Sequence, residues 1–352
     1  MSEKEYTLRK EFRVDLLLYV FYRAESCEAV YKKTAIDLAD RMRCNFPAFS
    51  GNRLNLEQHV LKSLAEKEDF DDFITYITNP RRQTEAFIKA EVEKYIFRDQ
   101  KDEAVNILKK NVDDIKTTVS QALFTATQKV QNQRGNTEMW LNDFSNVLKD
   151  ELTIYNIFSE NFSDIKDFHF LIEEIQKGFK SITEKMSSLS LDKLKESRLK
   201  PEEILIDQLC NCCWVKCPFC AAVCTNTMKA HSPDDHSTPF HRPDGINGYP
   251  YRKTKDLSVI FCTTLVRSEG GFYPSSEKAI PYKQYRIAGP PYDTWSITPD
   301  RSDLAYWKWF VCQFKTQLEN HYGKKFQGSG AIPDLWKYIS KEEAIRSLEE
   351  MF

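Results

Sequence analysis

Cysteine and histidine are concentrated in one short stretch of this chain, and both residue types bind metal ions. Nine of them lie between residues 210 and 241: Cys210, Cys212, Cys213, Cys217, Cys220, Cys224, His231, His236 and His241. The run Cys217-Pro218-Phe219-Cys220 separates two thiols by two residues, so both thiols can reach one ion. Thiolates and neutral imidazoles suit Zn²⁺ better than they suit hard cations. The stretch therefore predicts a zinc site.

The spacing of the later histidines predicts the rest of that site. Fifteen residues separate Cys220 from His236, and four separate His236 from His241. This is an acceptable spacing for a tetrahedral Cys2His2 site. The predicted ligands of a structural Zn²⁺ are Cys217, Cys220, His236 and His241. Three further residues are alternatives for one of these positions: Cys224, Cys212 and His231.

The other cysteines are predicted to stay reduced and to pack as small apolar side chains. Three of them belong to a helix expected to enter the site: Cys210, Cys212 and Cys213. Four others have no potential ligand close by in the sequence: Cys27, Cys44, Cys262 and Cys312. The start of the chain makes a poor signal peptide, and this favours reduced thiols in an intracellular protein.

A catalytic zinc is the less favoured interpretation of this stretch. His231, His236 and His241 recur every five residues, with Asp234 and Asp235 between them, and such a set could hold a zinc-bound water. However, a five-residue interval does not align side chains on one helix face, and the sequence contains no H-E-x-x-H. It also contains no phosphate loop, no dinucleotide-binding glycine fingerprint and no G-x-S-x-G turn. No catalytic or cofactor-binding residue is therefore predicted.

Glycine and proline divide the chain into two parts. Of 11 Gly and 14 Pro, only six residues precede residue 205: Gly51, Gly135, Gly178, Pro47, Pro80 and Pro201. Both residue types disfavour helix interiors, so the first part can form long helices and the second must be rich in loops. We predict a mainly α protein: a multi-helix, stalk-like bundle over residues 1–200, followed by a small zinc-stabilised α+β domain over residues 201–352.

Apolar residues in the first part recur at helical spacing. One series predicts a helix through Val105, Leu108, Val112, Ile115, Val119 and Ala122. A second series predicts a helix through Ile165, Phe168, Ile172, Ile175, Phe179, Ile182, Met186 and Leu189. Earlier helix-like segments are 14–22, 30–42, 56–65 and 82–97. Six or seven antiparallel helices are expected, with the apolar stripes as their core.

The second part is predicted to mix strands and helices. Residues 257–266 are rich in β-branched and aromatic side chains and predict a strand. Ser302 is expected to cap a helix over residues 303–322, whose apolar face carries Trp307, Phe310, Phe314 and Leu318. Pro333 can start a short helix through Tyr338, and Ser340 with Glu343 fits a capping box for a last helix.

Charge and hydropathy exclude two classes of partner. The chain has 50 Lys plus Arg and 52 Asp plus Glu, so it lacks the positive field of a nucleic-acid binder. The prolines at 233, 239 and 243 also break the region where a DNA-reading helix would be needed. No apolar run approaches the roughly 20 residues that a membrane helix requires. Protein partners or self-association through the helices are therefore expected, without nucleic acid or a membrane span.

Several blocks of the second part resemble the C-terminal region of the very large interferon-inducible GTPases, a family related to dynamin-like proteins. The blocks are Cys217–Cys220, His236–Pro243, Gly245–Gly248, Ile280–Lys283, Trp295–Asp300, Tyr306–Cys312 and Lys325–Gly328. The resemblance implies a large cytosolic protein, also found in the nucleus, whose nucleotide-binding domain lies upstream of a helical region. Because the guanine-nucleotide motifs are missing here, residues 1–352 are expected to be the C-terminal end of such a protein, with GTP bound only upstream. The alternative is a free-standing adaptor whose zinc domain binds a protein partner.

Overall fold

The computed structural model describes residues 26–148, 168–231, 236–251, 254–275, 278–299 and 303–350. The chain divides into two compact units that do not follow the order of the sequence. The first unit comprises Met1–Arg41 and Val92–Ile204, and the second comprises Met42–Glu91 and Leu205–Phe352. The chain is mainly helical, as predicted. Every helix within the described residues is too short or too polar to cross a lipid bilayer.

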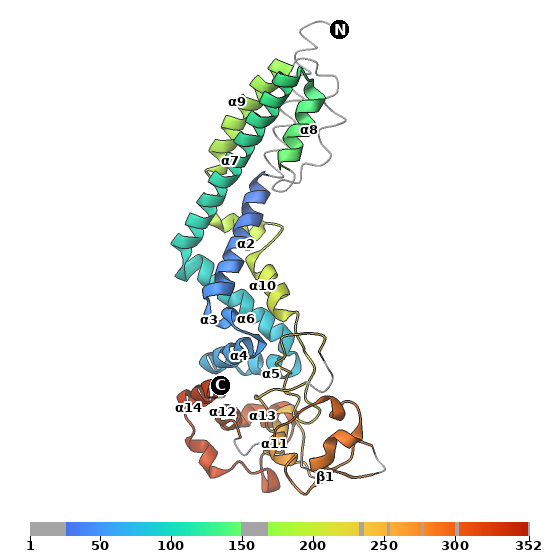
Figure 1. Ribbon diagram of the computed structural model, residues 1–352. Helices are drawn as coiled ribbons and strands as arrows, with labels where there is room; N and C mark the ends of the chain where they lie inside the picture. Colours follow the sequence, from blue (N-terminus) through green and yellow to red (C-terminus); the bar gives the residue numbers. More distant parts are fainter. Residues whose placement is uncertain are drawn as a thin grey trace. The chain divides into compact units, whose positions relative to one another are not determined.

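The described part of the first unit is mainly helical (Figure 1). Its described elements are most of α2 (Cys27–Asn45), the π-helix η2 (Tyr95–Asp99), α7 (Lys101–Gln133), α8 (Thr137–Leu148), α9 (Phe168–Met186) and the 3-10 helix η3 (Leu191–Glu196). Figure 1 shows α9 running beside the long helix α7, and the two helices are in contact. The predicted segment 14–22 lies outside the described residues.

The apolar series at residues 105–122 lies along α7, and its members from Leu108 onward are buried, which confirms that prediction. Leu108, Val112, Ile115 and Val119 are all at most 5% exposed. The helix ends where Arg134 adopts a left-handed conformation with φ of 49°. The second predicted series falls on α9, where Ile182 and Met186 are buried, and its first member, Ile165, lies outside the described residues.

The second unit joins residues from both ends of the chain. Its earlier helices are α3 (Pro47–Ser50), α4 (Arg53–Lys67), α5 (Phe70–Thr78) and most of α6 (Pro80–Lys94). Its later helices are most of α10 (Pro201–Cys210), α11 (Cys262–Leu265), α12 (Ala305–Gln313), α13 (Lys315–Tyr322) and α14 (Lys341–Glu349). The strands of its described residues are β1 (Gly271–Phe272) and β2 (Ile280–Pro281), which pair antiparallel.

Aromatic side chains form the contact between α5 and α12. The Phe73 ring centroid lies 4.5 Å from that of Phe310 and 5.2 Å from that of Phe314. The Tyr306 hydroxyl donates a 2.6 Å hydrogen bond to the Leu61 carbonyl oxygen of α4. The sequence prediction assigned residues 42–91 to the helical first domain, whereas here they share a core with residues after 205.

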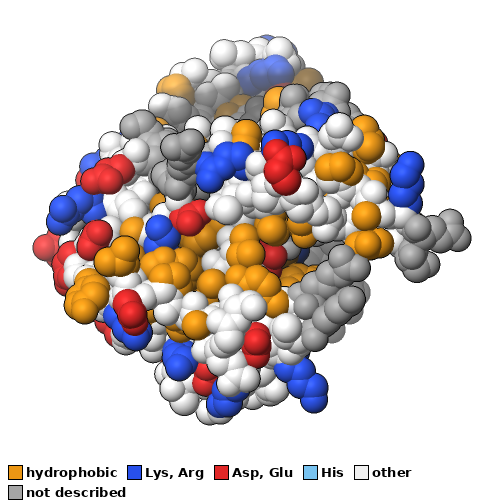
Figure 2. All heavy atoms as spheres, turned by 90° about the horizontal axis from the view of Figure 1, so that it is seen from below, with side chains coloured by type: hydrophobic (Ala, Val, Ile, Leu, Met, Phe, Trp, Pro, Cys, Tyr) orange, Lys and Arg blue, Asp and Glu red, His pale blue; other side chains and the backbone are white. Residues whose placement is uncertain are grey.

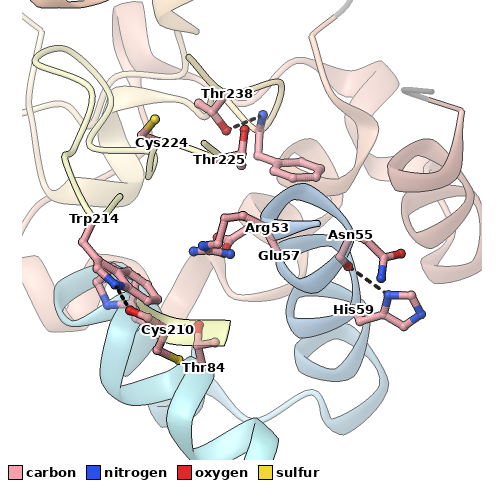
Figure 3. Close-up of polar contacts among 12 residues, drawn as sticks. Arg53, Asn55, Glu57, His59, Thr84, Cys210, Trp214, Cys224, Thr225 and Thr238 are labelled. Carbon is pink, nitrogen blue, oxygen red and sulfur yellow. Dashed lines mark hydrogen bonds and ion pairs between the residues drawn. The ribbon is translucent and has the colours of Figure 1, made fainter. Parts of the chain in front are cut away.

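A buried ion pair lies on α4 at the side that faces the cysteine-rich segment. Arg53 and Glu57 are one helical turn apart, and both side chains are fully buried. Tyr76 of α5 donates a hydrogen bond to Glu57, and the Arg53 guanidinium lies 4.6 Å from the centroid of the Trp214 ring. Figure 3 shows Arg53 and Glu57 side by side on this helix. The ion pair and the aromatic ring together compensate for the desolvation of Arg53.

The predicted strand at residues 257–266 is wrong. This segment makes isolated bridges, from Leu257 to Pro250 and from Phe261 to Pro243, and then turns into α11 at Cys262. Both bridge partners are prolines, which have no N–H to donate, so a continuous ladder cannot form. The short helix instead begins at Cys262, which enters the buried core.

The other predicted elements of the second part are largely confirmed. Residues 305–322 are helical but interrupted at Phe314 (φ −108°, ψ 22°), and the predicted apolar face is buried. Ser302 lies outside the described residues. A 3-10 helix, η9, follows Pro333 (Asp334–Tyr338), and the Ser340 side chain caps α14 by accepting a hydrogen bond from the Glu343 N–H.

Candidate metal centre

The segment after α10 folds back on itself as an irregular hairpin that carries four cysteines. Lys216 pairs with Val223, and the Cys217 N–H donates to the Ala222 carbonyl oxygen at 2.8 Å. The run Cys217–Cys220 forms the turn, which is closed by a 2.9 Å hydrogen bond from the Ala221 N–H to the Cys217 carbonyl oxygen. This tight turn directs two thiols to the same side, as the two-residue spacing predicts.

Two separate groups of Cys and His ligand atoms occur in the described residues. The first group is Cys217, Cys220, His241 and Cys262. The second group is Cys213, Cys224, His231 and His236. Within each group the candidate ligand atoms all lie within 4.8 Å of one another.

The first group is completely buried. His241, which precedes the 3-10 helix η5 (Asp244–Asn247), directs Nδ1 at two sulfurs, 3.2 Å from Cys220 Sγ and 3.1 Å from Cys262 Sγ. Its other ring nitrogen, Nε2, is buried and has no hydrogen-bond partner among the residues that the structure describes. In a tetrahedral zinc site, a Zn–S bond of about 2.3 Å and a Zn–N bond of about 2.05 Å place sulfur and nitrogen roughly 3.6 Å apart. Small movements of these side chains away from one another would therefore give the sulfur–nitrogen distances that a zinc site requires.

The structure divides the predicted ligands between the two groups. Cys217, Cys220 and His241 lie together, whereas His236 lies in the second group. The alternatives Cys224 and His231 also belong to the second group, and Cys212 belongs to neither. Cys262 and Cys213, expected only to pack, each occupy a position that a ligand would take.

Electrostatics within the first group favour a bound cation. Burial raises the pKa of Cys217 and of Cys262 well above the usual value for a thiol. Burial acts in the same direction on Cys220, but hydrogen bonds from the two neighbouring thiols and the charge of His241 bring its pKa well below the usual value. Burial thus opposes the formation of all three thiolates, and at Cys220 its neighbours outweigh this effect. A divalent ion would stabilise all three, because metal binding displaces thiol protons.

Arg242 and Asn247 brace the backbone of the Cys217–Cys220 turn. The Arg242 guanidinium donates to the carbonyl oxygens of Cys220 and Ala221 and to Asn247 Oδ1, each at 3.0 Å. Asn247 Nδ2 donates to the same Cys220 carbonyl oxygen at 2.8 Å. Arg242 is 1% exposed, although the described residues give it no ion pair with a carboxylate. These bonds fix the turn that presents the two thiols.

Aromatic rings cover the same turn. Phe219 packs against Phe272 and Tyr292, with ring centroids 5.0 and 5.3 Å away. Trp295 is fully buried, and its ring centroid lies 6.3 Å from that of His241 and 5.7 Å from that of His236. The irregular segments around the two groups are therefore held by packing as well as by hydrogen bonds.

One pattern in the sequence does indicate the second pair of cysteines. Cys213 comes four residues before Cys217, and Cys224 comes four residues after Cys220. In a hairpin that turns at Cys217–Cys220, such equal spacing places the outer two cysteines at similar heights on the two arms, and the pairing of Lys216 with Val223 makes them diagonal neighbours. Cys262 has no comparable signal, because 20 residues separate it from His241 in the sequence.

Comparison with known proteins identifies the region that carries both groups. The family model for the C-terminal domain of interferon-induced very large GTPase 1 matches residues 213–348. The mouse protein of that name is 38% identical over 329 residues, which are 92% of this chain and 13% of the mouse protein. The human protein is 36% identical over 343 residues, which are 96% of this chain and 14% of the human protein. This chain carries the C-terminal domain of that family.

The matched C-terminal domain, residues 213–348, contains all eight candidate ligands. It begins at Cys213, the first ligand of the second group. The similarity to the mouse and human proteins extends well beyond this domain into the helical residues. No solved structure matches the chain.

Ala221 of this C-terminal domain offers a test of the turn geometry. Its φ is +54°, a left-handed conformation that costs an L-residue about 1 kcal/mol. We expect Ala221→Gly to stabilise the second unit by about 0.5–1 kcal/mol, measured by urea unfolding followed through tryptophan fluorescence. The control is Ala222→Gly, at a buried position without positive φ, which should destabilise by about 1 kcal/mol. Equal effects at both positions would contradict the assigned turn.

Proposed function

We propose that Cys217, Cys220, His241 and Cys262 bind a structural Zn²⁺. The observation that carries this proposal is a fully buried set of three thiols and one imidazole nitrogen, converging within 4.8 Å. Four protein ligands fill the tetrahedral coordination of zinc and leave no position for a substrate water. The ion would therefore stabilise the fold, and hydrolytic chemistry would have no open site.

The chain as a whole is proposed to be a non-catalytic C-terminal portion of a very large interferon-inducible GTPase. The relatives' name supports GTP binding in the complete proteins, of which this chain covers 13% and 14%. We assign no GTP contact to any residue of this chain. Its helices would serve assembly, as helical regions do in dynamin-like proteins, and it would act in the cytoplasm and the nucleus.

Exposed apolar side chains support a role in assembly. In the first unit, Phe124 projects from α7 with 63% of its surface exposed. In the second unit, Ile287, Leu335 and Tyr338 are at least 70% exposed. Figure 2 shows hydrophobic side chains gathered near the centre of one face. Exposed large apolar groups of this kind commonly mark interaction sites.

Light scattering on the zinc-loaded chain tests this function. We expect self-association that increases with protein concentration, and no GTP hydrolysis by the chain alone. Phe124→Asp should weaken association at least about tenfold, because a charge then has to be desolvated at the contact. The control is Gln128→Asp, an exposed position one turn further along α7, which adds the same charge without removing an apolar group. A chain that is monomeric at all concentrations, or that hydrolyses GTP unaided, would contradict the proposal.

A further inference from the structure

The second group of ligand atoms, Cys213, Cys224, His231 and His236, is distinct from the structural site proposed above. Its members come from both arms of the hairpin and from the segment that follows it. The two thiols are buried, whereas the two imidazoles are half-buried. We propose that this group binds a second Zn²⁺, which exchanges with solvent more readily than the first.

The backbone of the hairpin positions the two thiols. The Cys213 N–H donates to the Asn226 carbonyl oxygen at 3.3 Å, and the Cys224 N–H donates to the Val215 carbonyl oxygen at 2.9 Å. These cross-arm bonds place the two cysteines near each other at the base of the hairpin. The Asn226 N–H also donates to Cys224 Sγ at 3.4 Å. A backbone N–H that points at a sulfur stabilises the thiolate, which is the form that binds metal.

The histidines face these thiols at distances that suit zinc. His236 Nδ1 lies 3.5 Å from Cys213 Sγ, and His231 Nε2 lies 3.9 Å from Cys224 Sγ. Both values are close to the roughly 3.6 Å that separates sulfur from nitrogen in a tetrahedral zinc site. The two imidazole rings are nearly perpendicular, at 85°, with centroids 4.5 Å apart. Two thiols and two imidazoles around one point form the Cys2His2 donor set of structural zinc sites.

His236 is held in place from two directions. The Ser296 N–H donates to the His236 carbonyl oxygen at 2.9 Å, and the Thr225 N–H donates to the Ser237 carbonyl oxygen at 3.0 Å. Figure 3 shows Thr238, the residue after Ser237, beside Thr225, with Cys224 next to them. The fold thus presents one histidine and both cysteines from hydrogen-bonded backbone, and His231 completes the set.

Burial and charge distinguish the two sites. The first site would combine three thiolates with Zn²⁺ behind a fully buried shell, whereas the second would pair two thiolates with Zn²⁺ and expose part of its imidazoles. Water and chelators therefore reach the second ion more easily. We expect extraction from the full chain in two phases, with the second site emptied at least about tenfold faster.

Metal stoichiometry of the full 352-residue chain tests this inference. Native mass spectrometry and elemental analysis should find about two zinc ions per chain, and about one in the double variant His231→Asn/His236→Asn. The matched control is His59→Asn on α4, since His59 contacts the Asn55 carbonyl oxygen and belongs to neither group. It should retain about two ions. Co²⁺ substitution should show that the double variant loses part of the thiolate-to-metal absorption while it keeps its circular dichroism.

The outcomes separate this site from the structural one. One ion in the wild type that the double variant retains would overturn the second site and leave the first intact. One ion that the double variant loses would support the second site and overturn the first. Two ions in both the wild type and the double variant, or none in either, would overturn the inference.

Discussion

Replacing Cys262 with serine should empty the first site and unfold most of the second unit, and the second site should then be lost with the fold that carries it. Cys262 is fully buried, and its sulfur lies 3.1 Å from His241 Nδ1, so no solvent ligand can easily take its place. A neutral serine hydroxyl is a poor zinc ligand in a site that prefers thiolate. Structural zinc contributes about 10–16 kcal/mol of apparent binding free energy in small domains. That contribution is as large as the roughly 5–15 kcal/mol that stabilises a typical domain.

Tryptophan fluorescence can follow this loss selectively. Five of the six tryptophans lie in the second unit: Trp214, Trp295, Trp307, Trp309 and Trp336. Their emission should shift to longer wavelength in the Cys262→Ser variant, and equally when a strong chelator is added to the wild type. The helical first unit should keep its circular dichroism signal.

The matched control is Cys312→Ser on α12. Cys312 is also a cysteine outside any disulfide, but it is only partly buried and belongs to neither ligand group. This variant should keep the zinc content of the wild type and lose at most about 1–2 kcal/mol of unfolding free energy. A Cys262→Ser protein with full zinc content and unchanged stability would show that the first group does not hold the ion.

The helical elements could be predicted because their signal is local. The spacing of Leu108, Val112, Ile115 and Val119 repeats within a single helix, and each of these residues is buried on α7. Ser340 and Glu343 mark the start of α14 in the same way. Periodicity and capping depend on neighbours a few residues away, so such patterns can be recognised in a single sequence.

The division of ligands depends on contacts between distant residues. Cys262 reaches His241 only because residues 257–261 pair with two prolines and the chain then turns into α11. The linear spacing of Cys220, His236 and His241 fits one zinc site, but it carries no information about which histidine faces which sulfur. His236 is directed to the second group by its backbone bridge to Trp295, which lies 59 residues later in the sequence.

The assignment of residues 42–91 illustrates the same limit. These helices have the polar and apolar pattern of the first part of the chain, yet Phe73 and Leu61 contact residues of α12. A boundary drawn from glycine and proline content records where loops begin, whereas a compact unit is defined by which surfaces meet. Helix α5 is rich in aromatic side chains, and its partners are the aromatic residues of α12.

Replacing Arg242 with methionine should weaken both the fold and the binding of zinc at the first site. The guanidinium is buried and makes three hydrogen bonds, two of them to the backbone carbonyls of Cys220 and Ala221 at the end of the turn. A site of three thiolates and one neutral imidazole around Zn²⁺ carries one net negative charge. Arg242 forms no ion pair with a carboxylate among the described residues. The ring centroids of Tyr76 and Trp307 lie 5.9 and 5.6 Å from its guanidinium, and we expect the charge of the site to add to the compensation that these rings provide.

The expected loss is about 3–5 kcal/mol of unfolding free energy, because both the hydrogen bonds and the charge compensation disappear. Zinc affinity, measured by competition with a chromophoric chelator, should fall about 10–100-fold, as it does when groups that orient metal ligands are removed. The stability and zinc affinity of Arg242→Lys should lie between those of the wild type and those of Arg242→Met. Lysine keeps the positive charge but lacks the planar guanidinium that reaches several acceptors.

The control is Arg267→Met, an exposed position in the same unit, which should change stability by at most about 0.5 kcal/mol and leave zinc affinity unchanged. Zinc affinity separates two roles for Arg242. A positioning residue supports the turn that presents Cys217 and Cys220, so its loss reaches the metal. If Arg242→Met lowers stability while zinc affinity stays at the wild-type value, Arg242 only fills space in the core. The charge of the proposed site would then be balanced elsewhere.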